Sequence, residues 1–142
     1  MLDKRYIGIF LIVFFVGCSL EENKKIGKVL PGTNTAVVGV SLGEDGMPQE
    51  TVKEVVVSPG NKVIYAGPDD FSIIFKNRKT PNQIVENKSE RGVVVIEIPA
   101  DIFQQKQFAE EFKNNNSLVF DYGIKVGDKE LDPPIRVIPP SN

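Results

Sequence analysis

Apolar residues recur at alternate positions in several short segments of the chain, and turn-forming residues separate these segments. In the stretch from Val55 to Asn77, three β-type segments alternate with two turn signals: Val55–Val57, Pro59-Gly60-Asn61, Lys62–Ala66, Gly67-Pro68-Asp69-Asp70 and Phe71–Phe75. Proline fixes φ in a tight turn, and glycine and asparagine tolerate positive φ, so each signal predicts a chain reversal. Three short strands at this spacing are typical of a β-sandwich or a small barrel.

Four further segments have strand character: Ala36–Leu42, Gly92–Ile98, Leu118–Val126 and Ile135–Ile138. The second is rich in β-branched residues, and the third places its apolar residues on one face. The last is bracketed by proline pairs, and proline lacks an N–H, so we expect a short strand at a sheet edge. Between the strands, Gly43-Glu44-Asp45-Gly46 predicts a hairpin turn.

One segment predicts a helix. Asp101 and Gln104 form a capping-box pattern, and helix-compatible residues continue to about Lys113. Phe108 and Phe112 are four residues apart and share one helix face, which we expect to be buried against the sheet together with Phe103. The predicted fold class is therefore mainly β, a Greek-key β-sandwich with one short helix.

The composition excludes several classes of chemistry. The chain has no histidine, no tryptophan and one cysteine, Cys18, which rules out disulfides within the chain, Cys/His zinc sites, histidine general bases and Cys-His dyads. The formal net charge of −2 argues against nucleic acid as the main partner, because phosphate binding needs a basic face. We expect no cofactor and no enzymatic activity.

The N-terminal segment has the pattern of a secretory signal peptide. Lys4-Arg5 precedes an apolar run, Tyr6–Gly17, which is too short for a comfortable membrane span of about 20 residues. Phe15-Val16-Gly17-Cys18 resembles the lipobox of bacterial lipoproteins, with phenylalanine where leucine is usual. In that family the cysteine becomes diacylglyceryl-modified, so that it carries fatty acyl chains such as palmitate, and it is the first residue of the mature chain. The alternative is an uncleaved anchor with an incidental cysteine.

This resemblance implies a signal peptide over residues 1–17 and a lipid anchor on Cys18 in a bacterial cell envelope. Ser19 is not the Asp that resembles an inner-membrane retention signal, so outer-membrane sorting is expected if the organism is Gram-negative. Residues 18–35 are polar, interrupted by Pro31-Gly32 and without apolar periodicity, which predicts a flexible tether. Residues 36–142 then form the folded domain.

Two segments resemble cupredoxin-like domains. VSPGNKVIYAGPDDFSIIF is similar to the first half of such a domain, and FDYGIKVGDKELDPPIRVIP is similar to the second half. The resemblance would place the first copper-ligating histidine near Phe71, the cysteine near Ile124, and the second histidine and the methionine within Lys125–Asp132. None of these ligands is present, and a blue-copper site requires them, so the resemblance implies the fold without a metal site. An immunoglobulin-like sandwich is the competing fold.

Three local features could carry a site. Asp69-Asp70 is either a cation or substrate contact or a turn in which the carboxylates bond their own backbone, and we favour the turn. Tyr122 is expected to be a core tyrosine whose hydroxyl reaches the backbone. Lys76–Gly92 carries a formal +3, whereas the rest of the mature chain carries −6. One hypothesis is therefore that four residues of this connection bind an anionic partner: Arg78, Lys79, Lys88 and Arg91.

The alternative for this connection is a solvated loop whose charges only maintain solubility. For the whole chain, the sequence predicts a membrane-anchored envelope lipoprotein whose non-catalytic β-sandwich binds a protein or an envelope polymer. A structural or assembly subunit of an envelope complex is the first alternative. A metal binder or enzyme that uses carboxylates alone is the second.

Overall fold

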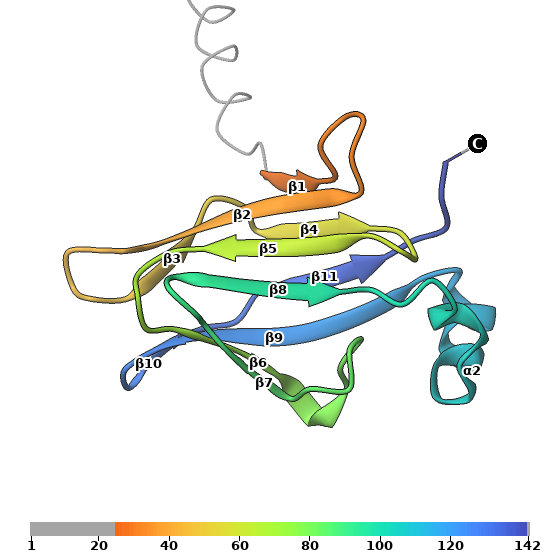
Figure 1. Cartoon of the computed structure of the whole chain (residues 1–142). Coiled ribbons are helices and arrows are strands. Elements are labelled where there is room, and N and C mark those ends of the chain that lie inside the picture. The colour runs from red at the N-terminus through yellow and green to blue at the C-terminus, as the bar shows by residue number, and fades with distance from the viewer. Residues whose placement is uncertain (1–24, 142) are drawn as a thin grey trace, which may run out of the picture.

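Over the residues that the structure describes, two β-sheets pack face to face and one α-helix lies at an end of the sandwich (Figure 1). The computed structural model describes residues 25–141. The larger sheet has the strand order β1 (Ile26–Lys28), β4 (Glu54–Val57), β11 (Pro134–Val137), β9 (Leu118–Val126), β6 (Ser72–Phe75) and β7 (Glu86–Lys88), and β10 (Lys129–Leu131) also pairs with β9. The smaller sheet has the order β3 (Pro48–Glu50), β2 (Thr35–Leu42), β5 (Lys62–Ala66) and β8 (Val93–Glu97).

The predicted mainly-β, two-sheet architecture with a short helix is confirmed. Both sheets are mixed, because β4 pairs in parallel with β1 and β11, and β2 pairs in parallel with β5. The Greek-key connectivity and the cupredoxin-like relationship stay predictions. No helix within the described part of the chain is both long enough and apolar enough to cross a bilayer.

The three consecutive strands of the Val55–Asn77 stretch alternate between the two sheets. β4 and β6 belong to the larger sheet, whereas β5, between them in sequence, belongs to the smaller one. The Pro59-Gly60-Asn61 turn is closed by a 2.8 Å hydrogen bond from the Ser58 N–H to the Asn61 side chain, and Gly60 has a φ of +85°. Each turn therefore carries the chain across the sandwich instead of forming a hairpin.

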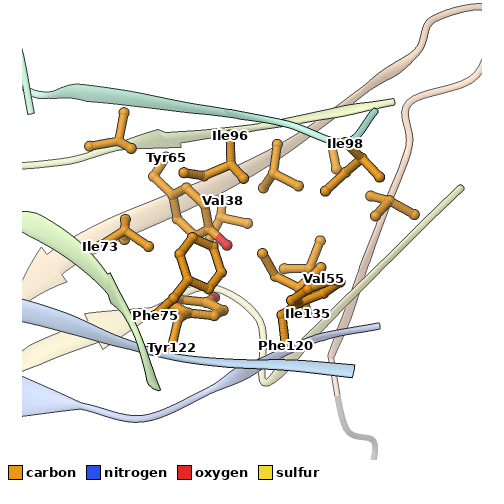
Figure 2. Packing of buried hydrophobic residues seen from close by; sticks show 14 of the residues in the cluster. Val38, Val55, Tyr65, Ile73, Phe75, Ile96, Ile98, Phe120, Tyr122 and Ile135 are labelled. Carbon is orange, nitrogen blue, oxygen red and sulfur yellow. The ribbon is translucent and has the colours of Figure 1, made fainter. Parts of the chain in front are cut away.

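The core lies between the sheets and is built from alternate residues of the long strands (Figure 2). Tyr65 of β5 and Tyr122 of β9 are fully buried and meet edge to face, with ring centroids 5.6 Å apart. Phe120, two residues before Tyr122, packs edge to face on Phe75 and on Phe108. These aromatic contacts connect both sheets and the helix into one hydrophobic cluster.

The helical segment differs from the predicted capping box. A 3₁₀ turn, η3 (Ile102–Gln104), comes first, and α2 (Lys106–Asn115) starts after it. Asp101 makes no capping hydrogen bond, and its carboxylate instead accepts a hydrogen bond from the Gln105 side chain. Burial of the aromatic face is confirmed for Phe108, whereas Phe112 is half-buried and stacks on Phe103 with ring centroids 3.8 Å apart.

Two expectations about the ends of the domain need correction. The prediction of a sheet edge for β11 is wrong: the strand lies between β4 and β9, because Pro134 is its first residue and the N–H groups of Ile135–Val137 remain available for pairing. Within the predicted tether, residues 26–28 form β1, which pairs with β4. Residues 18–24 of the tether lie outside the described residues.

Candidate functional site

The four basic residues assigned to partner binding fall into two pairs at opposite ends of the β6–β7 hairpin. Arg78 closes the 3₁₀ helix η2 (Lys76–Arg78), and Lys79 follows it, beside α2. Lys88 ends β7 opposite Ser72, the first residue of β6. Arg91 lies in the turn before β8. The structure therefore does not bring the four side chains into one cluster.

Lys79 is engaged within the fold. Its ammonium donates to the Glu111 carboxylate of α2 at 2.7 Å and to the Val119 carbonyl of β9 at 2.6 Å, and it lies 5.2 Å from the centre of the Phe120 ring. The half-buried Lys79 side chain thus joins the hairpin to the helix and the core. This is a structural role that the charge pattern alone did not indicate.

The β6–β7 connection is held by asparagine side chains. The buried Asn87 accepts a hydrogen bond from the Asn82 side chain at 3.0 Å and donates to the Ile84 carbonyl at 3.2 Å. Thr80 also donates to the Ile84 carbonyl, at 2.9 Å. These bonds present the exposed side chains of Ile84 and its neighbour Val85 on the surface of the loop.

β7 and β8 are joined by a tight turn, but they belong to different sheets. Arg91 and Gly92 both have positive φ, 53° and 77°, which is the geometry of a type I′ hairpin turn, and Glu90 and Val93 exchange two backbone hydrogen bonds across it. Pairing between the two strands ends at this turn, because the Ser89 N–H donates to the Phe71 carbonyl and β7 pairs with β6. β8 is therefore left as an edge strand.

The backbone of β8 has an unpaired edge. Gly92 and Ile98 direct their backbone groups toward β5, and Val93 directs its groups the other way, toward Glu90. Since these directions alternate along an antiparallel strand, Val95 and Glu97 also point their N–H and C=O groups outward. Neither residue's outward groups have a partner among residues 25–141. A groove of about 440 Å³ separates this edge from β7 and is lined in part by Ile84, Lys88 and Val95.

The solvent face beside this edge is apolar. Val37 of β2 is paired with Ile64 of β5, and Ile64 is paired with Val95 of β8, so the three side chains form a row across the smaller sheet. Val37 and Val95 are each nearly half exposed, at 48% and 46%. An exposed apolar edge strand is a site at which another chain can pair.

The opposite edge of the same sheet is protected. β3 has only three residues and begins with Pro48, which cannot donate a hydrogen bond. Its last residue, Glu50, pairs with the buried Val40, so the carboxyl group points into the sandwich. A charged group that points inward is one of the ways in which an edge strand avoids pairing with other chains. β8 has neither a proline nor an inward charge.

Glu50 makes a polar contact across the sandwich. The Tyr122 hydroxyl donates to the Glu50 carboxyl at 3.1 Å, which corrects the expectation that this hydroxyl bonds the backbone. Burial raises the pKa of Glu50 to about 7, and the hydrogen bond from Tyr122 lowers it only in part. The neighbouring Tyr65 hydroxyl is buried and has no hydrogen-bond partner among residues 25–141, and burial raises its pKa well above the ordinary tyrosine value.

The remaining predicted positions carry no converging chemistry. Asp69 and Asp70 lie in an exposed loop, where the Asp69 carbonyl accepts a hydrogen bond from Ser89. Phe71 and Ile124, where the resemblance would place copper ligands, are buried in the core. Between residues 25 and 141 no group of three or more acidic, cysteine or histidine side chains could hold a metal ion. Cys18 lies outside the described residues.

Sequence reasoning missed Glu50 and the β8 edge. The predicted turn at Gly43–Gly46 was the available signal for Glu50, because a hairpin continued beyond it sets Glu50 opposite Val40. The edge depends on strand order, which no local pattern specifies. No protein-family model matches the chain, and a search of curated proteins finds no significant match to its sequence.

Proposed function

We propose that this chain is a non-catalytic binding domain, held at a bacterial cell envelope by an acylated Cys18, that captures an extended segment of a partner protein along β8. The observation that carries the proposal is the pair of outward-facing, unpaired backbone positions at Val95 and Glu97. A segment that adds a strand to such an edge gains main-chain hydrogen bonds, and side-chain contacts provide the specificity.

The surroundings of the edge define the chemistry of the segment. Its apolar side chains would contact Val95 and the exposed Ile84 across the groove between β7 and β8. Lys88 at the end of β7 and Arg91 in the turn before β8 favour an acidic residue near the start of β8, and Glu97 at its end favours a basic one. Lys88 and Arg91 thus keep the partner-binding role proposed from the sequence, whereas Lys79 contributes to the fold.

A crosslinking experiment tests the surface. A photoreactive residue is placed at position 95 in β8 and, as the matched control, at the exposed position 49 in the protected edge β3. The expected result is one discrete crosslinked protein from position 95 in intact cells and none from position 49. Equal crosslinking from both positions, or a crosslinked product that is a second copy of this chain, would overturn the proposal.

A pair of substitutions then tests the mode of binding. Val95→Pro removes an outward N–H and leaves the β5 ladder bonds in place, whereas Val95→Thr keeps the N–H and the β-branched shape. We expect partner capture to be lost with proline and retained with threonine, while both variants remain folded by circular dichroism. Equal capture by the two variants would exclude strand addition.

The anchor rests on the lone cysteine and the lipobox-like residues before it. Two or more acyl chains give persistent membrane attachment, whereas one is marginal. Mass spectrometry of the membrane-extracted protein should show an acylated Cys18 as the first residue. An unmodified thiol on a full-length chain would exclude the anchor and leave the β8 proposal to its own tests.

The fold that we propose for this domain is cupredoxin-like and without redox function. The resemblance of its two halves to cupredoxins and the absence of histidine from the whole chain support this assignment. Copper added to the purified protein should produce no charge-transfer band in the visible spectrum. A strong band would contradict it.

A further inference from the structure

A second groove lies at the protected edge of the smaller sheet, far in the strand order from β8. Its volume is about 520 Å³, within the range of small-molecule sites. One wall comes from β3 and the residues after it, and the other from the link between β10 and β11. The walls are mainly apolar, with these side chains: Pro48, Val52, Leu131, Pro133 and Pro134.

Glu50 is one of the polar residues that line this groove, together with Gln49, Lys53 and Asp132. The Glu50 carboxyl accepts a hydrogen bond from the Tyr122 hydroxyl, and a carboxylate has acceptor capacity beyond one such bond. No lysine or arginine among residues 25–141 forms an ion pair with it. A half-buried carboxyl without a cationic partner is uncommon, since buried charges are normally paired.

The nearby cations are otherwise placed. Lys53 lines the groove, but its side chain is exposed to solvent and is not paired with Glu50. Lys76, which directly follows β6, forms an ion pair with Glu130 and a second one, at 3.3 Å, with Asp132. Asp132 is itself on the wall of the groove and adds a second carboxylate to it. Asp132 is ion-paired with Lys76, so the groove combines apolar walls with one carboxyl, that of Glu50, for which residues 25–141 supply no cationic partner.

We propose that this groove binds a small molecule that carries a primary ammonium group on an apolar body. The ammonium group lies against the Glu50 carboxyl, and the apolar body covers the proline, valine and leucine side chains. Charge complementarity selects an amine over a carboxylic acid of the same shape. The desolvated wall selects it over a molecule with two or more charges, because each further charge would lose hydration without a partner.

Binding should depend on pH in a defined direction. The groups that face Glu50 are Tyr122 of β9, Tyr65 of β5, and Lys53 and Asp132 on the groove walls. Burial raises the pKa of both tyrosine hydroxyls, so they stay protonated between pH 6 and pH 8. Since the pKa of Glu50 is about 7, the fraction of ionised carboxyl rises through this range. Affinity for an ammonium ligand should therefore rise roughly tenfold from pH 6 to pH 8.

The test uses calorimetric titration of the full chain, solubilised in a non-ionic detergent, with phenethylammonium as the probe. Phenylethanol and phenylpropionate are matched ligands in which a hydroxyl or a carboxylate replaces the ammonium group. We expect measurable binding of the amine, at least about tenfold weaker binding of the other two, and the rise between pH 6 and pH 8. Absent amine binding, equal binding of all three, or an affinity that is constant with pH would overturn the proposal.

A variant pair locates the site. Glu50→Gln keeps the size of the side chain and removes its charge, and Glu44→Gln makes the same change in the exposed turn before β3. Glu50→Gln should reduce amine affinity at pH 8 by about tenfold or more and abolish its pH dependence, whereas Glu44→Gln should change neither. Melting curves confirm that both variants are folded. Unchanged binding by folded Glu50→Gln would place the amine elsewhere and exclude this site.

Discussion

The Tyr122 hydroxyl of β9 lies 3.1 Å from a carboxyl oxygen of Glu50 in β3, so a donor of one sheet reaches an acceptor on the edge of the other. The contact connects β3, which pairs with β2 in the smaller sheet, to the central strand β9 of the larger sheet. It also couples the stability of this edge to proton binding.

Stability should fall as pH rises from about 4.5 to about 7. The folded-state pKa of Glu50 is raised to about 7 from 4.5, so the folded protein binds more protons than the unfolded chain in this interval. The free energy of unfolding therefore decreases with pH, by about 1–2 kcal/mol once solvent screening of this half-buried group is included.

Chemical denaturation at a series of pH values measures this dependence. Glu50→Gln should remove the decrease between pH 4.5 and pH 7, while Glu44→Gln should leave it in place. A decrease of the same size in Glu50→Gln would assign the effect to other groups.

The two core tyrosines should respond in opposite ways to loss of the hydroxyl. Tyr65→Phe removes a buried hydroxyl that has no partner and should stabilise the protein by about 1 kcal/mol. Tyr122→Phe removes the donor to Glu50 and should destabilise it by about 1–2 kcal/mol near pH 7. Thermal or denaturant unfolding of both variants measures these two changes in stability. A clear loss of stability in Tyr65→Phe would mean that its hydroxyl has a partner in solution.

Substitutions of the basic residues in the β6–β7 connection should differ in their effect on stability, because some of these residues contact the fold and others are exposed. Lys79→Ser removes contacts to Glu111, Val119 and Phe120 and should cost about 1–2 kcal/mol. Lys88→Ser is the matched control at an exposed position and should cost less than about 0.5 kcal/mol. Denaturant midpoints measure both. Equal effects of the two substitutions would show that the Lys79 contacts contribute nothing to stability.

The turn before β8 should depend on glycine at position 92. Gly92 has a φ of +77°, and a Cβ added there would lie 2.6 Å from the Gly67 carbonyl oxygen. Gly92→Ala should therefore destabilise by more than about 2 kcal/mol. Gly127→Ala is the control, because Gly127 has a φ of +62° but open space around it. There the alanine should destabilise only by the cost of a left-handed backbone conformation, about 1–2 kcal/mol. Similar losses in both would show that the contact with Gly67 relaxes freely.

Local sequence patterns predicted the strands in which the alternation of apolar and polar residues itself determines which side chains are buried. Leu118–Val126 matches β9 at both ends, because its alternation already separates a core face from a solvent face. β7 and β10 have three residues each, too few for a pattern, and form because neighbouring strands offer backbone partners. Short strands of this kind are a property of the assembled sheet.

The candidate sites were less predictable for a related reason. Charge identified Lys88 and Arg91 as exposed basic residues, but it could not distinguish them from Lys79, whose partner Glu111 is distant in sequence. Glu50 was equally hidden, because its environment is set by Val40, Tyr122 and the residues around Pro133. Sequence alone identifies ionisable groups, and their functional state depends on contacts between distant segments.

The position of β1 determines how a lipid-anchored form of this protein would face its surroundings. β1 and β7 are the two ends of the larger sheet, separated by five strand spacings or about 24 Å. From Cys18 to Ile26 the chain can extend at most about 25–30 Å. The β1 side would therefore be the part of the domain nearest the anchor, and the β7 end of the larger sheet would be the part farthest from it (Figure 1). A partner could then reach the β8 edge without approaching the bilayer that holds the anchor. A soluble molecule and a molecule fixed in a facing membrane would have the same access to this edge.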